Sequence, residues 1–283
     1  MKPVILAINR LIPRSRTEPT VDRVATWLAA RGIPVMHVEN GSGRWEDLAA
    51  ARASDADLAV ALGGDGTVLA SSRMFADLGV PILGVRLGKL GFLSEVEPPV
   101  VVGALEKWAD GNFWIESRLM LELCVVRDGE TVYTGCCLND VVLSRGATLR
   151  AVEVAFEIDG QPVAGYAGDG LIIATPTGST AYSLSAGGPI LVPELQAILV
   201  TPLCAHSLWL RPCVVSPNST IRMYLTREAM HSVVVLDGQE SFSVYAGDEL
   251  CVRRAHYACR LVRIKQFNYF RVLSRKLQGE TGG

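Results

Sequence analysis

Residues Gly63-Gly64-Asp65-Gly66-Thr67 place one carboxylate among three glycines, directly after the apolar residues 58–62. Glycine lets a backbone approach a ligand closely, and successive N–H groups ahead of a helix attract anions. This segment therefore has the composition of a strand end that meets a phosphate, with a carboxylate ready to act on a neighbouring group. Taken alone, Gly-Asp-Gly is also typical of an ordinary turn.

A second group of polar residues runs from Asp169 to Pro189 and is rich in serine, threonine and glycine. We interpret it as a strand followed by a loop. Short hydroxyls and backbone N–H groups can bind sugar hydroxyls and phosphates, and Tyr182 can contact a base or cap a pocket. The alternative is a solvated loop, or a helix start capped by Ser179 or Thr180.

The elements around the first motif alternate between strand and helix. Apolar runs and helix-ending glycines predict strands at 4–8, 35–38, 58–62 and 82–85, a helix at 21–31 ended by Gly32, and a helix at 67–78 ended by Gly79. Ligands of such α/β sheets bind beyond the carboxyl ends of the strands, which is where Asp65 falls.

From about residue 119 the pattern changes to short or alternating strands, at 120–125, 152–158, 221–225 and 233–236, with turns at Asp128-Gly129 and Asp159-Gly160. This predicts an α/β domain at 1–117 and a β-rich domain at 118–254. The remaining segment, 255–283, continues a stretch from 252 to 277 whose charged residues are all basic. That stretch is either an anion-binding stripe or, more commonly, a solvated face.

Composition favours an ordinary folded enzyme, with 283 residues of which 49% are hydrophobic and 20% charged. The net charge of −2 gives no reason to expect a nucleic-acid partner. No apolar run reaches the roughly 20 residues that span a bilayer, and residues 1–8 are too short and unflanked for a signal peptide. The 7 cysteines lack paired zinc-type spacing, so we expect reduced cytoplasmic thiols.

Together these motifs resemble the NAD kinase family. The matching segments appear in the family's order at 63–67, 81–93, 138–143, 169–189 and 201–208, followed by Arg211-Pro212. The first motif alone is shared with diacylglycerol and sphingosine kinases. The segment 169–189 makes the resemblance specific.

The resemblance implies a Rossmann-like α/β N-terminal domain, a sandwich-like β domain, and a C-terminal segment that returns to pack on the first domain. It implies a phosphotransferase with an alcohol acceptor, which moves a phosphoryl group from ATP or another donor to the 2′-hydroxyl of the adenosine ribose of NAD, giving NADP. Asp65 would be catalytic. An ordinary carboxylate has a pKa of about 4, far below that of a sugar hydroxyl, so Asp65 would align the hydroxyl first and accept its proton late.

The resemblance also implies the remaining site residues. Gly63, Gly64, Gly66 and Thr67 would bind phosphate, and a divalent cation, Mg²⁺, would be held mainly through donor phosphates, with no dedicated protein ligands. Phe92 would wall the pocket. The NAD contacts would be Asp65, Gly66, Asn139, Asp140, Arg150, Asp169, Thr180, Ala181, Tyr182, Ser183, Leu184, Ser185 and Gln239.

Two of these residues have distinct chemistry. The amide of Asn139 can both donate to and accept from one edge of adenine. Asp140 stands where the family usually has glutamate, which keeps the charge and shortens the reach. Without the family, Asn139-Asp140 would be interpreted as a turn or strand-end pair.

Other polar residues have simpler interpretations. A lone histidine such as His206 is more often structural than catalytic. Arg86 and Lys89 could neutralise donor phosphates or could lie in a surface loop.

Two alternative functions stay open. A diacylglycerol-type lipid kinase would share the glycine-aspartate turn but would not need Asn139-Asp140 or the 180–185 loop. A noncatalytic NAD(P) sensor would not need Asp65. The family further implies a homodimer or homotetramer in the cytoplasm, without a membrane or nucleic-acid partner.

Overall fold

The computed structural model describes residues 2–40, 45–46, 49, 51, 55–146, 151–205, 210–226, 232–266 and 268–278. The chain forms two compact units, one of residues 1–117 with 258–283 and one of residues 118–257. The predicted domain boundaries, after residues 117 and 254, stay predictions, because compactness alone does not test whether each part folds independently. No helix in the described ranges is long and apolar enough to cross a membrane.

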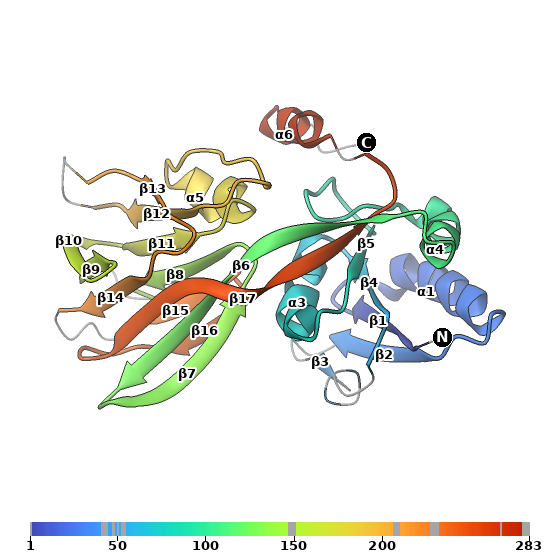
Figure 1. Ribbon diagram of the computed structural model, residues 1–283, viewed down its shortest axis with the longest axis horizontal. Helices are drawn as coiled ribbons and strands as arrows, with labels where there is room; N and C mark the ends of the chain where they lie inside the picture. The colour runs from blue at the N-terminus through green and yellow to red at the C-terminus, as the bar shows by residue number, and fades with distance from the viewer. Residues whose placement is uncertain are drawn as a thin grey trace. The chain divides into compact units, whose positions relative to one another are not determined.

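The first unit contains a parallel sheet (Figure 1). Its strands are β1 (Val4–Asn9), β2 (Val35–Asn40), β4 (Leu58–Gly63) and β5 (Ile82–Arg86), in the order β5-β4-β1-β2, with β3 (Trp45–Glu46) antiparallel to β2. The end of β17 (Glu249–Arg263) lies beside β5. All of β4 is buried, as expected for a parallel strand covered on both faces.

The described helices of this unit are α1 (Arg14–Ala29), α3 (Asp65–Phe75) with the short η1 (Ala76–Leu78), η2 (Pro98–Val100), α4 (Val101–Ala109) and α6 (Tyr269–Leu277). Figure 1 shows α1 and α4 on one face of the sheet and α3 on the other. The left-handed Gly79 ends the α3–η1 helix as predicted. Helix α1 begins at Arg14 rather than at Val21, because the chain stays helical through Pro19 despite the lost hydrogen bond.

The second unit contains two sheets. The first holds β6 (Trp114–Arg127), β7 (Glu130–Cys137), β9 (Val152–Ile158), β10 (Gln161–Gly168), β14 (Ile221–Leu225) and part of β17, in the order β10-β9-β14-β17-β6-β7. The second holds β8 (Asp140–Ser144), β11 (Gly170–Ala174), β12 (Ile198–Leu203), β13 (Cys213–Val215), β15 (Val233–Leu236) and β16 (Glu240–Ser243), in the order β13-β12-β11-β8-β15-β16.

Alternate residues of both sheets form one apolar core, which includes Leu121 of β6, Phe156 of β9 and Ile173 of β11. This arrangement is a sandwich. The predicted fold class, an α/β part followed by a mostly β part, is confirmed. The predicted turns at Asp128-Gly129 and Asp159-Gly160 are also present, because both residues of each pair have positive φ. The structure shows that each turn joins two antiparallel strands, β6 to β7 and β9 to β10.

Candidate active site

Asp65 is the first residue of α3, directly beyond the carboxyl end of β4. Gly64 is extended and caps the helix, whose first turn closes when Thr67 N donates to Gly64 O at 2.9 Å. A Cβ at Gly63 would stand 2.0 Å from Thr67 Oγ1, so glycine is needed for this sharp strand-to-helix turn. Thr67 is buried, and its hydroxyl faces Gly63 and accepts from Asn9 Nδ2 at 3.5 Å.

The Asp65 carboxylate is held by three consecutive backbone N–H groups. Oδ2 accepts from Phe92 N at 2.7 Å, and Oδ1 accepts from Leu93 N at 3.1 Å and Ser94 N at 3.3 Å. The Ser94 hydroxyl adds a bond to Oδ1 at 3.2 Å. Each oxygen of a carboxylate has about two lone-pair sites for hydrogen bonds. Oδ1 accepts three of the bonds above and Oδ2 only one, so Oδ2 is the oxygen that keeps capacity for another partner.

Gly91 makes this arrangement possible. A Cβ at Gly91 would stand 1.9 Å from Oδ1 and 2.6 Å from Oδ2 of Asp65. Phe92 was predicted as a site residue in this loop, whereas Gly91 and the N–H groups of residues 92–94 were missed. The two glycines at 88 and 91 were the available signal, because glycine permits a close backbone approach.

Residues at the end of β17 form hydrogen bonds to the loop that holds Asp65 and to the residues next to it. The buried Arg263 donates through Nη1 to Leu93 O at 3.4 Å and to Glu95 Oε2 at 3.1 Å, and through Nε to Glu116 at 2.5 Å. Glu95 Oε1 also accepts from the backbone N–H groups of Ile264 and Lys265. Arg263 is thus an exception to the solvated face expected for the basic C-terminal stretch.

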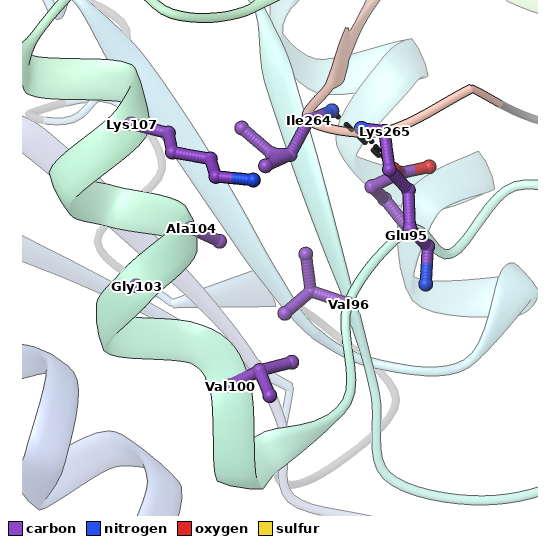
Figure 2. Close-up of a pocket in the computed structure, with 8 residues that line it drawn as sticks. All are labelled: Glu95, Val96, Val100, Gly103, Ala104, Lys107, Ile264 and Lys265. Atoms are coloured by element: carbon purple, nitrogen blue, oxygen red, sulfur yellow. Dashed lines mark hydrogen bonds between the residues drawn. The ribbon is translucent and has the colours of Figure 1, made fainter.

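A cavity of about 220 Å³ lies beside this network (Figure 2). Its lining is Glu95, Val96, Val100, Gly103, Ala104, Lys107, Ile264 and Lys265. Figure 2 shows Lys107 of α4 reaching toward Ile264. Ligand pockets usually measure about 300–1,000 Å³, so this cavity is small for a dinucleotide, and it contains none of the predicted site residues.

The ring of Phe92 is buried against the C-terminal helix. Its centroid lies 5.6 Å from that of Tyr269, and Lys276 Nζ lies 4.7 Å from the Phe92 centroid. Lys276 Nζ also lies 3.8 Å from Asp65 Oδ2. The structure therefore brings Asp65, Phe92 and Lys276 together, although sequence reasoning did not single out Lys276.

In the second unit, Asp237 organises the start of β8. Its Oδ2 accepts from Leu138 N at 3.2 Å, and its Oδ1 accepts from Asn139 N at 2.7 Å and Asp140 N at 3.4 Å. The Asn139 side chain has no hydrogen-bond partner among the described residues and is half-buried, so its amide can meet a ligand. Sequence reasoning missed Asp237, for which the adjoining Gly238 gave only a turn signal.

The same strand end is locked to the serine- and threonine-rich loop. Thr175 N donates to Asn139 O at 2.8 Å, and Thr175 Oγ1 donates to Leu138 O at 2.6 Å. A Cβ at Gly178 would stand 2.1 Å from Asn139 O. These contacts fix the start of the serine- and threonine-rich loop relative to Asn139.

Asp140 is 4% exposed. Burial raises the pKa of its carboxyl to about 7, with a further contribution from the negative charge of Asp237. Near neutral pH the Asp140 carboxyl exists in both forms, so it can donate a hydrogen bond as well as accept one.

The predicted loop residues differ in exposure. Ser183 is fully buried and its hydroxyl bonds to Thr201 Oγ1 at 2.8 Å, so this side chain serves the fold. Tyr182 and Ser185 are exposed, and Thr180, Ala181 and Leu184 are partly exposed. The loop contains η3 (Gly178–Thr180) and α5 (Tyr182–Ser185). The alternative of a cap by Ser179 or Thr180 is wrong, because Ala181 precedes α5 and no side chain caps it.

Asp169 lies away from this group. Gly170 pairs with Ser144 and Ala174 with Asp140, so Asp169 is at the opposite end of the β8–β11 pair from Asn139. Its Oδ1 is bonded to Arg145 Nε at 2.7 Å. Gln239 is exposed beside the turn after β15, and Arg150 and His206 lie outside the described residues.

The described residues contain no group of three or more His, Cys, Asp or Glu side chains that could hold a metal ion. At the glycine motif, Asp65 Oδ2 is the carboxylate oxygen with remaining acceptor capacity. A single carboxylate oxygen fits a metal ion that is held mostly by other ligands, such as phosphate oxygens, rather than by a cage of protein side chains.

Comparison with known proteins is consistent with this geometry. Residues 5–113 match the family model for the ATP-NAD kinase N-terminal domain, and residues 138–264 match that for the ATP-NAD kinase C-terminal domain. The NAD kinase of Heliobacterium modesticaldum is 43% identical over 264 residues, which are 90% of this chain and 92% of the relative. The NAD kinase of Geobacter sulfurreducens is 40% identical over 281 residues, 96% of this chain and 98% of the relative.

Solved structures are similar as well. Yeast NADH kinase, crystallised with NADH, matches with a TM-score of 0.84 and 26% identity, covering 100% of this chain and 89% of that one. An NAD kinase from Archaeoglobus fulgidus, crystallised with ATP, shares the fold with a TM-score of 0.73 and 24% identity, covering 97% of this chain and 98% of that one. With both family models matched and relatives at about 40% identity along most of its length, the chain belongs to the NAD kinase family.

Proposed function

We propose that this NAD kinase transfers the terminal phosphoryl group of ATP to the 2′-hydroxyl of the adenosine ribose of NAD. One observation carries the chemical part of the proposal: the Asp65 carboxylate is fixed at the carboxyl end of β4 by the N–H groups of residues 92–94. The description of the matched family models supports ATP as donor. The NADH bound to yeast NADH kinase supports a nicotinamide dinucleotide as acceptor.

Asp65 aligns the acceptor hydroxyl. Oδ2 keeps acceptor capacity, so a sugar hydroxyl can donate to it while Oδ1 stays bonded to the loop. Because phosphoryl transfer has a loose transition state, the hydroxyl proton leaves late, and a fixed carboxylate contributes mainly by holding the nucleophile in line.

Two glycines of the motif, Gly64 and Gly66, bind phosphate through their backbone. Gly64 is partly exposed and Gly66 exposed at the N-terminus of α3, where the helix dipole favours an anion. Gly63 and Thr67 are buried and support the turn, so their contribution is to its shape. Magnesium, bound through the donor phosphates, would neutralise part of their charge.

Asn139, Asp140 and the exposed part of the 180–185 loop bind the adenosine. The unpartnered Asn139 amide pairs with one edge of adenine, and Asp140, able to donate or accept near neutral pH, meets a ribose hydroxyl. Tyr182 offers an exposed ring for stacking. For Asp169, Gln239 and Arg150 the NAD contact rests on the family resemblance.

We also propose a reducing, cytoplasmic setting and a homo-oligomer. Cys124, Cys204, Cys213 and Cys251 are free thiols, which suits a reducing compartment. The oligomer rests on the family resemblance and is measured by light scattering at several concentrations.

The test is NADP formation by the purified protein supplied with NAD, ATP and Mg²⁺. A dehydrogenase that accepts NADP but not NAD reports the product and distinguishes a 2′-phosphate from a 3′-phosphate. We expect steady turnover that stops when the divalent cation is chelated. NAD binding without turnover, with ATP, other triphosphates or polyphosphate, would contradict the proposal in favour of a noncatalytic sensor.

A further inference from the structure

The C-terminal helix α6 is anchored at the loop that holds Asp65. Asn268 caps the helix by accepting from Arg271 N at 3.0 Å, and Tyr269 is buried against Phe92. Lys276 lies two turns after Tyr269 and therefore on the same face of the helix. This spacing sets the Lys276 ammonium over the Phe92 ring, 4.7 Å from its centroid.

The ammonium also faces the carboxylate. Lys276 Nζ lies 3.8 Å from Asp65 Oδ2, the oxygen that keeps acceptor capacity. A hydrogen-bonded ion pair would measure about 2.7–2.9 Å, so Lys276 is near Asp65 without being fixed to it. Among the described residues, no other lysine or arginine has its charged group within 4.0 Å of Asp65.

Stability gives little reason for a lysine at this position. The Lys276 side chain is 37% exposed, and exposed ion pairs contribute at most about 1 kcal/mol. Phosphoryl transfer, in contrast, depends on positive charge beside the transferred group. In the glycine motif itself the positive end of α3 supplies only partial charge.

We propose that Lys276 is a catalytic residue, whose ammonium contacts the terminal phosphoryl group of ATP and neutralises the charge on its oxygens during transfer. In that step the 2′-oxygen of NAD bonds to the terminal phosphorus while the bond from this phosphorus to the bridging oxygen breaks. ADP leaves with that electron pair, and the hydroxyl proton passes to Asp65 and then to water. The inference rests on the proposed function, because it takes Asp65 to mark the position of the acceptor hydroxyl.

The test compares three variants with the wild type. Lys276→Met keeps the apolar stem on Phe92 and removes the charge, Lys276→Arg keeps the charge, and Arg275→Met removes the neighbouring cation of the same helix. We measure kcat, KM for ATP, the Kd for NAD by calorimetry, and the melting temperature. Lys276→Met is expected to lower kcat about 100-fold, with the NAD Kd and melting temperature nearly unchanged.

The controls separate the possible outcomes. Arg275→Met is expected to keep kcat within about 2-fold, and Lys276→Arg to recover at least about 10% of it, since charge is the property required. A Lys276→Met variant with wild-type kcat would overturn the proposal, and one with raised kcat would show instead that Lys276 restrains Asp65. Absence of NADP formation by the wild type would be a failure of the proposed function, which the same assay reports separately.

Discussion

Replacing Gly91 with alanine tests whether the loop after β5 sets the position of Asp65. The new Cβ would stand 1.9 Å from Asp65 Oδ1, whereas real Cβ contacts are essentially never under 3.0 Å. Oδ1 must therefore move by about 1 Å, and it carries the bonds from Leu93 and Ser94 that fix the carboxylate. A misplacement of about 1 Å costs about 100-fold in rate, so we expect kcat of Gly91→Ala to fall by about that factor.

Gly88→Ala is the matched control, because a Cβ there meets nothing within 4 Å and Gly88 lies in the same loop. The assay is NADP formation at saturating NAD and ATP, with the NAD Kd and melting temperature measured for both variants. Wild-type kcat in Gly91→Ala, or an equal loss in both variants, would refute the steric reasoning.

Three further predictions concern buried charges. Burial raises the pKa of Asp140 from 3.8 to about 7, so the stability that this carboxyl contributes is present below pH 3.8 and is lost as pH rises through 7. Between pH 5 and 8, urea unfolding should show the free energy of unfolding of the wild type falling by about 2–3 kcal/mol relative to that of Asp140→Asn. Parallel pH profiles of the two proteins would contradict this prediction. Arg263→Met removes the cation that pairs with Glu95 and Glu116 and should lower the free energy of unfolding by about 3–5 kcal/mol, against under about 1 kcal/mol for the exposed Arg253→Met. Equal losses in the two variants would argue against the buried network. Asp237→Ala removes the acceptor for three backbone N–H groups and should displace Asn139, raising KM for NAD at least about 10-fold. Initial rates at saturating ATP measure this KM. An unchanged KM would contradict the idea that Asp237 positions Asn139 for NAD.

Local signals were sufficient for much of the fold. The uninterrupted apolar run of β4, followed by the glycines around Asp65, predicted a buried strand ending at a helix, and the Asp-Gly pairs predicted two turns. These features depend on residues adjacent in sequence. Alternation of apolar residues likewise predicted β9, β14 and β15.

The rest depends on contacts between residues far apart in the chain. The N–H groups that hold Asp65 come from residues 92–94, and no local pattern reports that a loop will turn its N–H groups toward a carboxylate. In the sequence Arg263 resembles the other basic residues of its segment, and only the tertiary structure shows that it is buried against Glu95. Ser183, likewise, cannot be distinguished from its exposed neighbours by sequence, because its buried position depends on a hydrogen bond to the distant Thr201.

The most direct test of the catalytic role of Asp65 is kcat for NADP formation by Asp65→Asn, measured together with the Kd for NAD. The asparagine keeps the size of the side chain and removes the carboxylate that aligns the hydroxyl and takes its proton. We predict a fall in kcat of at least about 100-fold with a nearly unchanged NAD Kd. A variant that turns over like the wild type would contradict a catalytic role for the Asp65 carboxylate.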